Sequence, residues 1–324
     1  MIPRHARILD RALTRLKLRQ LRLLVAVGRE GSIQAAAKGL GISQPAATKM
    51  IQDLELDFEV RLFDRTNRGV VPTAFGASLI RHATLIFAQL SNAAQELDDL
   101  SEGNSGRVTV GTLLAASPAL LPAAIDRLRA ERPKVAVKIV EGTNEVLMPR
   151  LLAGEIDMIV GRLPRERHRA QIVQETFFET RVLAVTGPTH PLAGAAEVTY
   201  PQLARHGWIL PPSETTLRRQ ADQFLARQPQ APPLIAVESV SYLANRALLR
   251  SNDFIGLMPA PVAALDIAHG LLVAIDWTAP FGAGPVGVSH RGQEGLSPAG
   301  TAFLDALRAA SDGLAIGQSD SDMR

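Results

Sequence analysis

Apolar and polar positions follow two different patterns along the 324-residue chain, and the change falls near residue 107. Before that point apolar residues recur every three to four positions. This spacing predicts helices over Leu18–Arg29, Ser32–Gly39 and Ser43–Asp57. Two short apolar runs, Val60–Phe63 and Gly69–Val71, then predict a β-hairpin with the sequence DRTNR at its tip. Beyond residue 107 short apolar strands alternate with helical segments, which predicts an α/β fold with largely parallel sheets.

The segment GSIQAAAKGLGISQPAATKMIQDL predicts two short helices that cross closely around a tight turn. Ala37 and Ala47 are small enough for a close crossing, and Gly41 accepts the positive φ that the turn favours. Ser32 and Ser43 are suitable N-caps for the two helices. This arrangement is typical of a helix-turn-helix, and it predicts a sequence-specific DNA-binding protein.

In such a motif the first turn of the second helix enters the major groove and reads base edges. Gln44 offers both amide atoms to an adenine, while Pro45 and the methyl group of Thr48 suit a thymine methyl group. Arg65 and Arg68 at the predicted hairpin tip make it a wing that suits phosphates or a minor groove, the alternative being a solvated hairpin. The candidate DNA-binding residues are Ser32, Ser43, Gln44, Pro45, Thr48, Lys49, Gln52, Arg65 and Arg68.

The stretch from Thr73 to Glu102 contains no proline and one glycine, and its apolar residues alternate at spacings of four and three. This heptad pattern predicts a long helix that pairs with another copy of itself rather than lying on its own domain. The GNSG segment that follows predicts a flexible joint. The candidate dimerisation residues are Leu79, Ala83, Ile86, Leu90, Ala93, Leu97 and Leu100.

Composition and charge narrow the class of protein. Residues 1–72 hold 13 Lys/Arg and 7 Asp/Glu, a net charge of +6, so the remainder carries −3 of the total +3. A basic head on a slightly acidic body favours contact with a phosphate backbone. The absence of cysteine excludes thiol catalysis, disulfides, zinc fingers and iron–sulfur clusters. Without an apolar run of about 20 residues or a signal-peptide pattern, we expect a cytoplasmic protein that does not associate with membranes.

Enzymatic activity is not expected. The seven histidines are scattered without metal-ligand spacing, and no G-x-S-x-G elbow, P-loop or dinucleotide-binding G-x-G-x-x-G follows a strand. We therefore expect no cofactor and no metal. A solute-binding protein and an architectural DNA-binding protein without inducer control are the alternatives. The first would not need a helix-turn-helix, and the second would not need 200 residues of α/β fold.

Two motifs, LRQLRLLVAVGREGSIQAAAKGLGISQPAATKMIQDLE and VRLFDRTNRGVVPTAFG, resemble the LysR-type transcriptional regulators in order and spacing. The later segments LLPAAIDRLR, VEGTNEVLMPRLLAGEIDMIVGRL and WILPP are most similar to the sugar-responsive and protocatechuate-responsive branch of that family. The resemblance implies a winged helix-turn-helix, a linker helix and a two-lobed effector domain like a type-2 periplasmic binding protein. It also implies dimers that assemble into tetramers on interrupted palindromes of double-stranded DNA, with RNA polymerase as a further partner.

Mapped onto this chain, the family plan sets the expected domain boundaries. The predicted parts are a DNA-binding head (1–72), a linker helix and hinge (73–106), an effector domain (107–311) and a disordered tail (312–324). Lobe one would comprise 107–180 and 285–311, and lobe two 181–284. Residues 1–17, a basic extension, are either an amphipathic extension of the first helix or a segment before the true start codon.

A two-lobed sensor binds its ligand where strands end and helices begin, because free N–H groups meet there. Hydroxyl groups at such ends suit a carboxylate or a polyol, and Arg162 suits a carboxylate. Trp208, Tyr242 and Trp277 are aromatic side chains that would either stack on a sugar or belong to the core. The sequence leaves a sugar inducer and an aromatic or organic acid inducer both open. The candidate effector-binding residues are Thr112, Ser117, Thr143, Asn144, Arg162, Ser213, Thr215, Ser239 and Ser241.

Overall fold

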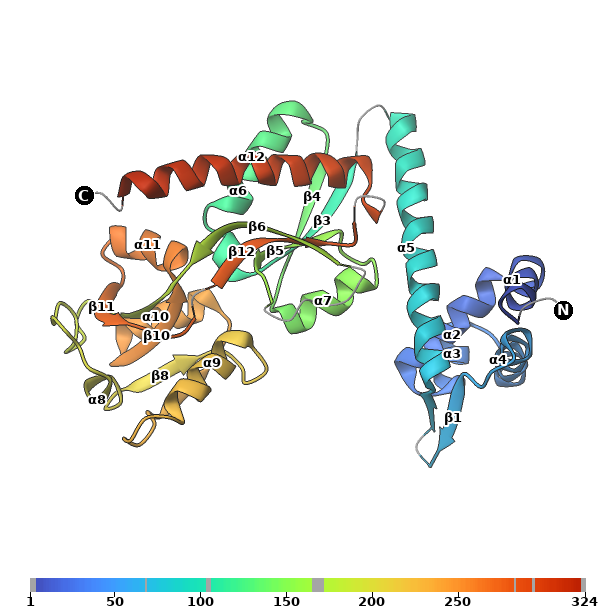
Figure 1. The fold of residues 1–324 in the computed structure, drawn as a ribbon, viewed down its shortest axis with the longest axis horizontal. Coiled ribbons are helices and arrows are strands. Elements are labelled where there is room, and N and C mark those ends of the chain that lie inside the picture. Colours follow the sequence, from blue (N-terminus) through green and yellow to red (C-terminus); the bar gives the residue numbers. More distant parts are fainter. Residues whose placement is uncertain are drawn as a thin grey trace. The chain divides into compact units, whose positions relative to one another are not determined.

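The computed structural model describes residues 4–67, 69–102, 106–164, 172–282, 284–292 and 295–321 (Figure 1). The chain forms two compact units, which divide within one long helix near Ser91. Each unit has apolar clusters of its own. None of the helices in the described ranges is long and apolar enough to cross a membrane.

The first unit is a helical head with a two-stranded wing. Its elements are α1 (Arg4–Arg15), α2 (Leu18–Glu30), α3 (Ile33–Gly39), α4 (Gln44–Phe58), β1 (Phe63–Thr66), β2 (Gly69–Pro72) and the first part of α5 (Ala74–Glu102). Leu23, Leu24 and Leu54 are fully buried in its core. Ala37 and Ala47 are 2% and 0% exposed, so the small residues predicted at the crossing of α3 and α4 do lie in the core.

The caps predicted for the helix-turn-helix are confirmed. Ser32 Oγ accepts a hydrogen bond from the N–H of Ala35 at 3.3 Å, and Ser43 Oγ accepts one from the N–H of Ala46 at 3.4 Å. Gly41 has a φ of +66°, a left-handed conformation that favours glycine. These features fix where α4 begins, and therefore which of its residues form its first turn.

The wing is shorter at its tip than the sequence predicted. In β1 and β2, Thr66 pairs with Gly69, which leaves a two-residue connection in place of the predicted five-residue tip. Arg65 therefore pairs with Val70 inside the ladder and does not lie at the tip. Arg68 lies outside the described residues.

The second unit contains two lobes, and lobe one is built on the sheet β4-β3-β5-β12-β6. Helices α6 and α12 cover one face of this sheet and α7 the other (Figure 1). Lobe one consists of β3 (Arg107–Thr112), η1 (Leu114–Ala116), α6 (Leu120–Glu131), β4 (Ala136–Glu141), α7 (Asn144–Leu152), β5 (Met158–Arg162), β6 (Val173–Thr180), β12 (Gly284–His290) and α12 (Pro298–Ser321).

Lobe two is built on the sheet β11-β7-β10-β8-β9. Two apolar clusters lie on its opposite faces, one with α9 and the other with α10 and α11. Lobe two consists of β7 (Val182–Thr186), α8 (Tyr200–Leu203), β8 (Gly207–Leu210), α9 (Thr216–Leu225), β9 (Ile235–Glu238), α10 (Tyr242–Ser251), β10 (Phe254–Pro259), α11 (Ala260–Ala268) and β11 (Val273–Thr278).

Both sheets are mixed, so the prediction of largely parallel sheets is wrong. β3 pairs parallel with β4 and β5, and β8 pairs parallel with β9 and β10. β12 and β7 instead pair antiparallel with both of their neighbours. The reason is that the chain passes between the lobes twice, from β6 to β7 and from β11 to β12. The return strand β12 runs against the strands that preceded it.

The end of the chain also differs from expectation. Disorder was predicted from Asp312, but α12 continues as a helix to Ser321. The residues after Asp312 include Leu314, Ala315 and Ile316 and no proline, and the helix continues through Gly313 and Gly317, which weaken a helix less than proline does.

Candidate functional site

The exposed face of α4 gathers the predicted base-reading side chains. Gln44, Pro45, Thr48, Lys49 and Gln52 line one shallow groove on this helix, together with Asp53 and Leu56. Positions 44, 48 and 52 recur at four-residue spacing, which places them on one side of the helix. Ser32 and Ser43 lie at the beginnings of α3 and α4, where each hydroxyl already serves as a cap.

The predicted dimerisation seam on α5 divides into two parts. Leu79 and Ala83 belong to the core of the head, where Ala83 is fully buried. Ile86, Leu90 and Leu97 are 40%, 46% and 68% exposed, and Ala93 is also exposed. The backbone of Leu100 lies in α5, and its side chain is outside the described part of the structure. The exposed part of the predicted dimerisation seam therefore begins at Ile86.

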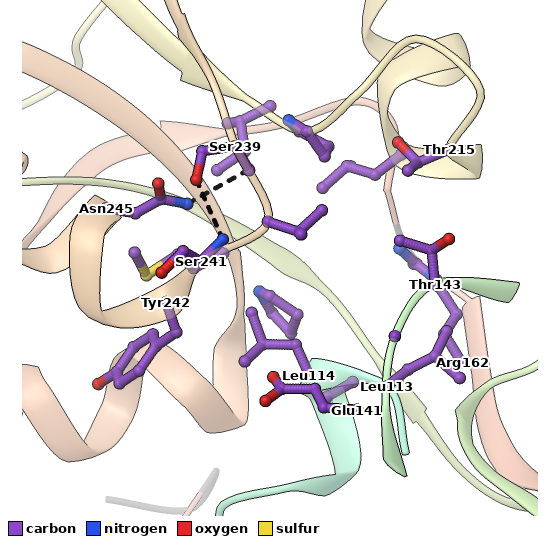
Figure 2. Close-up of a pocket in the computed structure, with 18 of the residues that line it drawn as sticks. Leu113, Leu114, Glu141, Thr143, Arg162, Thr215, Ser239, Ser241, Tyr242 and Asn245 are labelled. Carbon is purple, nitrogen blue, oxygen red and sulfur yellow. Dashed lines mark hydrogen bonds between the residues drawn. The ribbon is translucent and has the colours of Figure 1, made fainter. Parts of the chain in front are cut away.

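A cavity of about 670 Å³ lies between the two lobes of the second unit. This volume falls within the range of small-molecule binding sites. Figure 2 shows Ser239, Ser241 and Asn245 on one side of the cavity and Thr143 and Arg162 on the other. The predicted residues that line it are Ser117, Thr143, Asn144, Arg162, Thr215, Ser239 and Ser241.

Two predicted effector-binding residues do not line the cavity. Thr112, the last residue of β3, is 2% exposed, and its hydroxyl lies 3.5 Å from Ser117 Oγ. Ser213 is exposed on the turn before α9, whereas Thr215 at the beginning of that helix faces the cavity. The ends of strands and the beginnings of helices therefore locate the cavity-lining residues only to within two positions along the chain.

Three helices begin at the cavity wall, namely α7, α9 and α10. Thr215 Oγ1 accepts from the N–H of Arg218 at 3.4 Å, and Ser241 Oγ accepts from the N–H of Ala244 at 3.4 Å. Helix α10 begins at Tyr242, and Ser241 is its N-cap. The first N–H groups of such helices have no acceptor within the helix, so they attract anions.

The polar side chains of the wall are held in place by their own hydrogen bonds. Asn144 Nδ2 donates to the carbonyl of Arg162 at 3.0 Å, which ties the beginning of α7 to the end of β5. Across the cavity, Asn245 Nδ2 donates to the carbonyl of Ser239 at 3.4 Å, and the N–H of Ser241 donates to Ser239 Oγ at 3.0 Å (Figure 2). The wall is therefore largely preformed.

Sequence reasoning missed the apolar and acidic parts of the wall. Large aliphatic side chains supply much of the lining, and their pattern in the sequence is that of any core residue. Glu141 and Glu145 also line the cavity. The described lining therefore holds two carboxylates and one cation, Arg162. The aliphatic lining residues include Leu113, Leu114, Leu210, Leu217, Leu243, Leu257 and Met258.

Of the three aromatic residues considered for sugar stacking, only Tyr242 lines the cavity. Trp208 is 0% exposed, and its Nε1 donates to the carbonyl of Leu203 at 3.1 Å. Trp277 packs against Phe224 and other rings of lobe two. The Tyr242 hydroxyl donates to Asp266 at 2.6 Å, and burial and this hydrogen bond raise the pKa of the phenol, which keeps it neutral.

Comparison with known proteins identifies relatives for both units. Residues 18–77 match the bacterial regulatory helix-turn-helix protein family model, lysR family, and residues 101–312 match the LysR substrate binding domain. The transcriptional regulator GbpR of Azospirillum brasilense is 33% identical over 92% of this chain and 87% of its own length. The regulator PcaQ of Agrobacterium fabrum is 31% identical over 94% of this chain and 98% of its own length.

Solved structures share the fold at lower identity. Full-length LysG of Corynebacterium glutamicum with bound effector Arg has a TM-score of 0.61 and 19% identity, covering 92% of this chain and 99% of that one. Full-length CbnR, a LysR family regulator, in complex with its target DNA has a TM-score of 0.58 and 21% identity, covering 91% and 100% of the two chains.

Proposed function

The chain belongs to the LysR family of transcriptional regulators, and from this premise we propose that its DNA binding is switched by a hydroxylated organic acid held between the two lobes. Its relatives are regulators and not enzymes. The proposed parts are the head, the linker helix and the effector domain, with the boundaries given above. We also propose a cytoplasmic location, since the function requires access to DNA.

The observation that supports an acid is the position of Arg162 in the cavity wall. It is the one Lys or Arg in the described lining, and the beginnings of three helices lie at the same cavity. A guanidinium and free N–H groups together favour a carboxylate on the ligand. Glu141, Glu145 and the fixed amides of Asn144 and Asn245 supply oxygen acceptors, which favour hydroxyl groups elsewhere on the same ligand.

The rest of the wall favours an apolar ligand body over a free sugar. A sugar ring exposes hydroxyl groups on its edges and usually stacks on an aromatic face. Among the described lining residues Tyr242 is the only aromatic one, and several leucines surround the remaining space. An aromatic or other compact hydroxy acid uses both the apolar wall and the polar groups.

A thermal-shift comparison of the full chain tests this proposal. Hydroxybenzoates and sugar acids would be compared with their neutral amides and parent sugars at equal concentration. A ligand that binds only the folded protein stabilises it by about 2.7 kcal/mol at 100 times its Kd, which raises the unfolding midpoint. We expect an acid to raise the midpoint and its neutral analogue to have little effect. Equal shifts from neutral sugars would contradict the acid assignment.

At the DNA end, we propose that α4 reads bases and that the exposed seam from Ile86 to Leu97 joins two copies. The dimers, and tetramers formed from them, would bind interrupted palindromes and bring the regulator near RNA polymerase. Ligand-driven closure of the lobes would change the spacing of two heads and the bend of the DNA. The exposed apolar positions on α5 support the pairing, because they are otherwise left in water.

Replacing Gln44 by alanine is expected to weaken specific binding by about 1–3 kcal/mol, because a bidentate amide–base contact would be lost. Binding to a scrambled duplex should change little. Gel shifts at several salt concentrations, on the recognised and scrambled duplexes, measure both. Equal losses on the two duplexes would show that Gln44 does not read a base. Lys49→Ala is the comparison, since loss of a phosphate contact should instead weaken binding to both duplexes and flatten the salt dependence.

A further inference from the structure

Helix α1 lies outside the part of the head that matches the family model, which begins at residue 18. It carries four arginines and one aspartate, a net charge of +3. Residues 18–72 hold 8 Lys/Arg and 6 Asp/Glu, a net charge of only +2. The recognition helix α4 itself has one lysine and three acidic residues, a net charge of −2. Much of the positive charge of the head therefore lies on α1.

Helix α1 is joined to the end of the recognition helix by ion pairs. Arg11 Nη1 lies 2.8 Å from Glu59 Oε1, and Arg7 Nη2 lies 3.9 Å from the other oxygen of the same carboxylate. Arg15 Nη1 lies 3.9 Å from Asp57 Oδ1. The acidic end of α4 therefore faces cations that come from α1.

The apolar side of α1 also contacts the head. Ile8 shares a crevice with Phe58 at the end of α4 and with Phe75 and Leu79 of α5. Leu16, just after α1, packs against the core of the head. Helix α1 is therefore a packed part of the head.

Glu59 occupies a position that its backbone geometry does not favour. It is the C-cap of α4, with φ of +54° and ψ of +37°, a left-handed conformation in which glycine is usual. A carboxylate is also unfavourable at the negative end of a helix dipole. Neither the backbone nor the dipole accounts for a glutamate here, whereas the pairing with Arg7 and Arg11 does.

We propose that α1 raises the affinity of the head for DNA indirectly, because its arginines neutralise the acidic end of the recognition helix. The inference goes beyond base reading by α4, and it rests on the proposed DNA binding of the head. Most of the affinity of a protein for any duplex comes from attraction to phosphates, which acidic groups near the contact weaken. The Debye length is about 14 Å at 50 mM salt and about 6 Å at 300 mM, so the contribution of α1 is largest at low salt.

The test uses the full chain and a fixed 40-base-pair duplex of arbitrary sequence, with fluorescence anisotropy at 50 and 300 mM salt. Arg7→Ala with Arg11→Ala should weaken binding about three- to tenfold at 50 mM, and much less at 300 mM. Adding Glu59→Gln to this double variant should recover most of the loss, since the uncompensated carboxylate is then absent. Arg7→Lys with Arg11→Lys should bind like wild type, because the charges are retained.

The matched control is Arg129→Ala with Arg132→Ala, which removes two exposed arginines from the effector domain. Equal losses in the control and the α1 variant would overturn the proposal. A loss that Glu59→Gln does not recover would mean that the arginines contact DNA directly, which also overturns it. Weak binding by the double lysine variant would indicate a packing role instead.

Glu59→Gln alone should bind at least as tightly as wild type, a result that does not depend on the folding of the alanine variants. If wild type fails to bind any duplex, the proposed function of the head fails first.

Discussion

Replacing Gly76 by alanine is expected to unfold the head of this regulator and abolish its DNA binding. A Cβ at position 76 would overlap the backbone carbonyl oxygen of Leu62. That oxygen is already fixed, because it accepts a hydrogen bond from the N–H of Thr73 at 2.9 Å. Thr73 Oγ1 in turn accepts from the N–H of Gly76 at 3.1 Å, so neither side of the contact is free to move. We expect a loss of at least about 3 kcal/mol, the upper end for overpacking of a buried site.

Amide hydrogen exchange of residues 18–72 in the full chain measures this effect on the head separately from the effector domain. Gly39→Ala is the matched control, because a Cβ at that position meets no atom within 4 Å. The control should be neutral or stabilising by up to about 1 kcal/mol, since alanine favours a helix more than glycine does. Exchange protection of Gly76→Ala equal to wild type would show that the contact between α5 and the start of the wing is looser than described.

Replacing Arg162 by alanine is expected to remove most of the affinity for the acid that we propose as the inducer. Arg162 ends β5, and its guanidinium packs over Gly284, where a Cβ would lie 3.3 Å from Nε. This position places the cation beside the strand that returns from lobe two. Loss of one partner of a buried charge pair costs about 2–5 kcal/mol, or about 30- to 5,000-fold in affinity.

Titration calorimetry of the full chain, with the acid that gives the largest thermal shift, measures this loss. Arg162→Lys should bind with intermediate affinity, because it keeps the charge and loses the planar fork. Arg150→Ala removes a comparable arginine, which pairs with Glu155 at 3.1 Å and does not line the cavity, and it should bind like wild type. Binding by Arg162→Ala within twofold of wild type would place the carboxylate elsewhere in the cavity.

The features of this protein that could be predicted from its sequence are those determined by residues close to one another in the chain. Ser32, Ser43 and Gly41 determine caps and a turn through neighbours three or four residues away, and they lie where expected. The register of the wing was predicted less well, because it depends on pairing between Thr66 and Gly69. The antiparallel position of β12 depends on a chain return across more than 100 residues, for which no local pattern exists.

In the candidate site, too, some residues could be predicted from the local sequence and others could not. Hydroxyl and amide residues at strand ends were found because such positions carry a recognisable chemistry. Leu243 and Met258 were missed, since an apolar residue gives no sign of whether it faces a core or a cavity. The pairing of Arg11 with Glu59 joins residues 48 positions apart, and charge counts alone gave no indication of it.

If the proposed function is correct, an acid bound between the lobes changes how the head engages DNA. DNase I footprinting of the full chain, on DNA upstream of the genes beside its own, tests it most directly. Wild type should protect an interrupted palindrome, and the acid should alter the boundaries or the hypersensitive positions of that footprint. Arg162→Ala should protect the same site and show no change with the acid. A wild-type footprint that a saturating acid leaves unchanged, or the absence of any protected site, would show that this chain is not an acid-switched regulator.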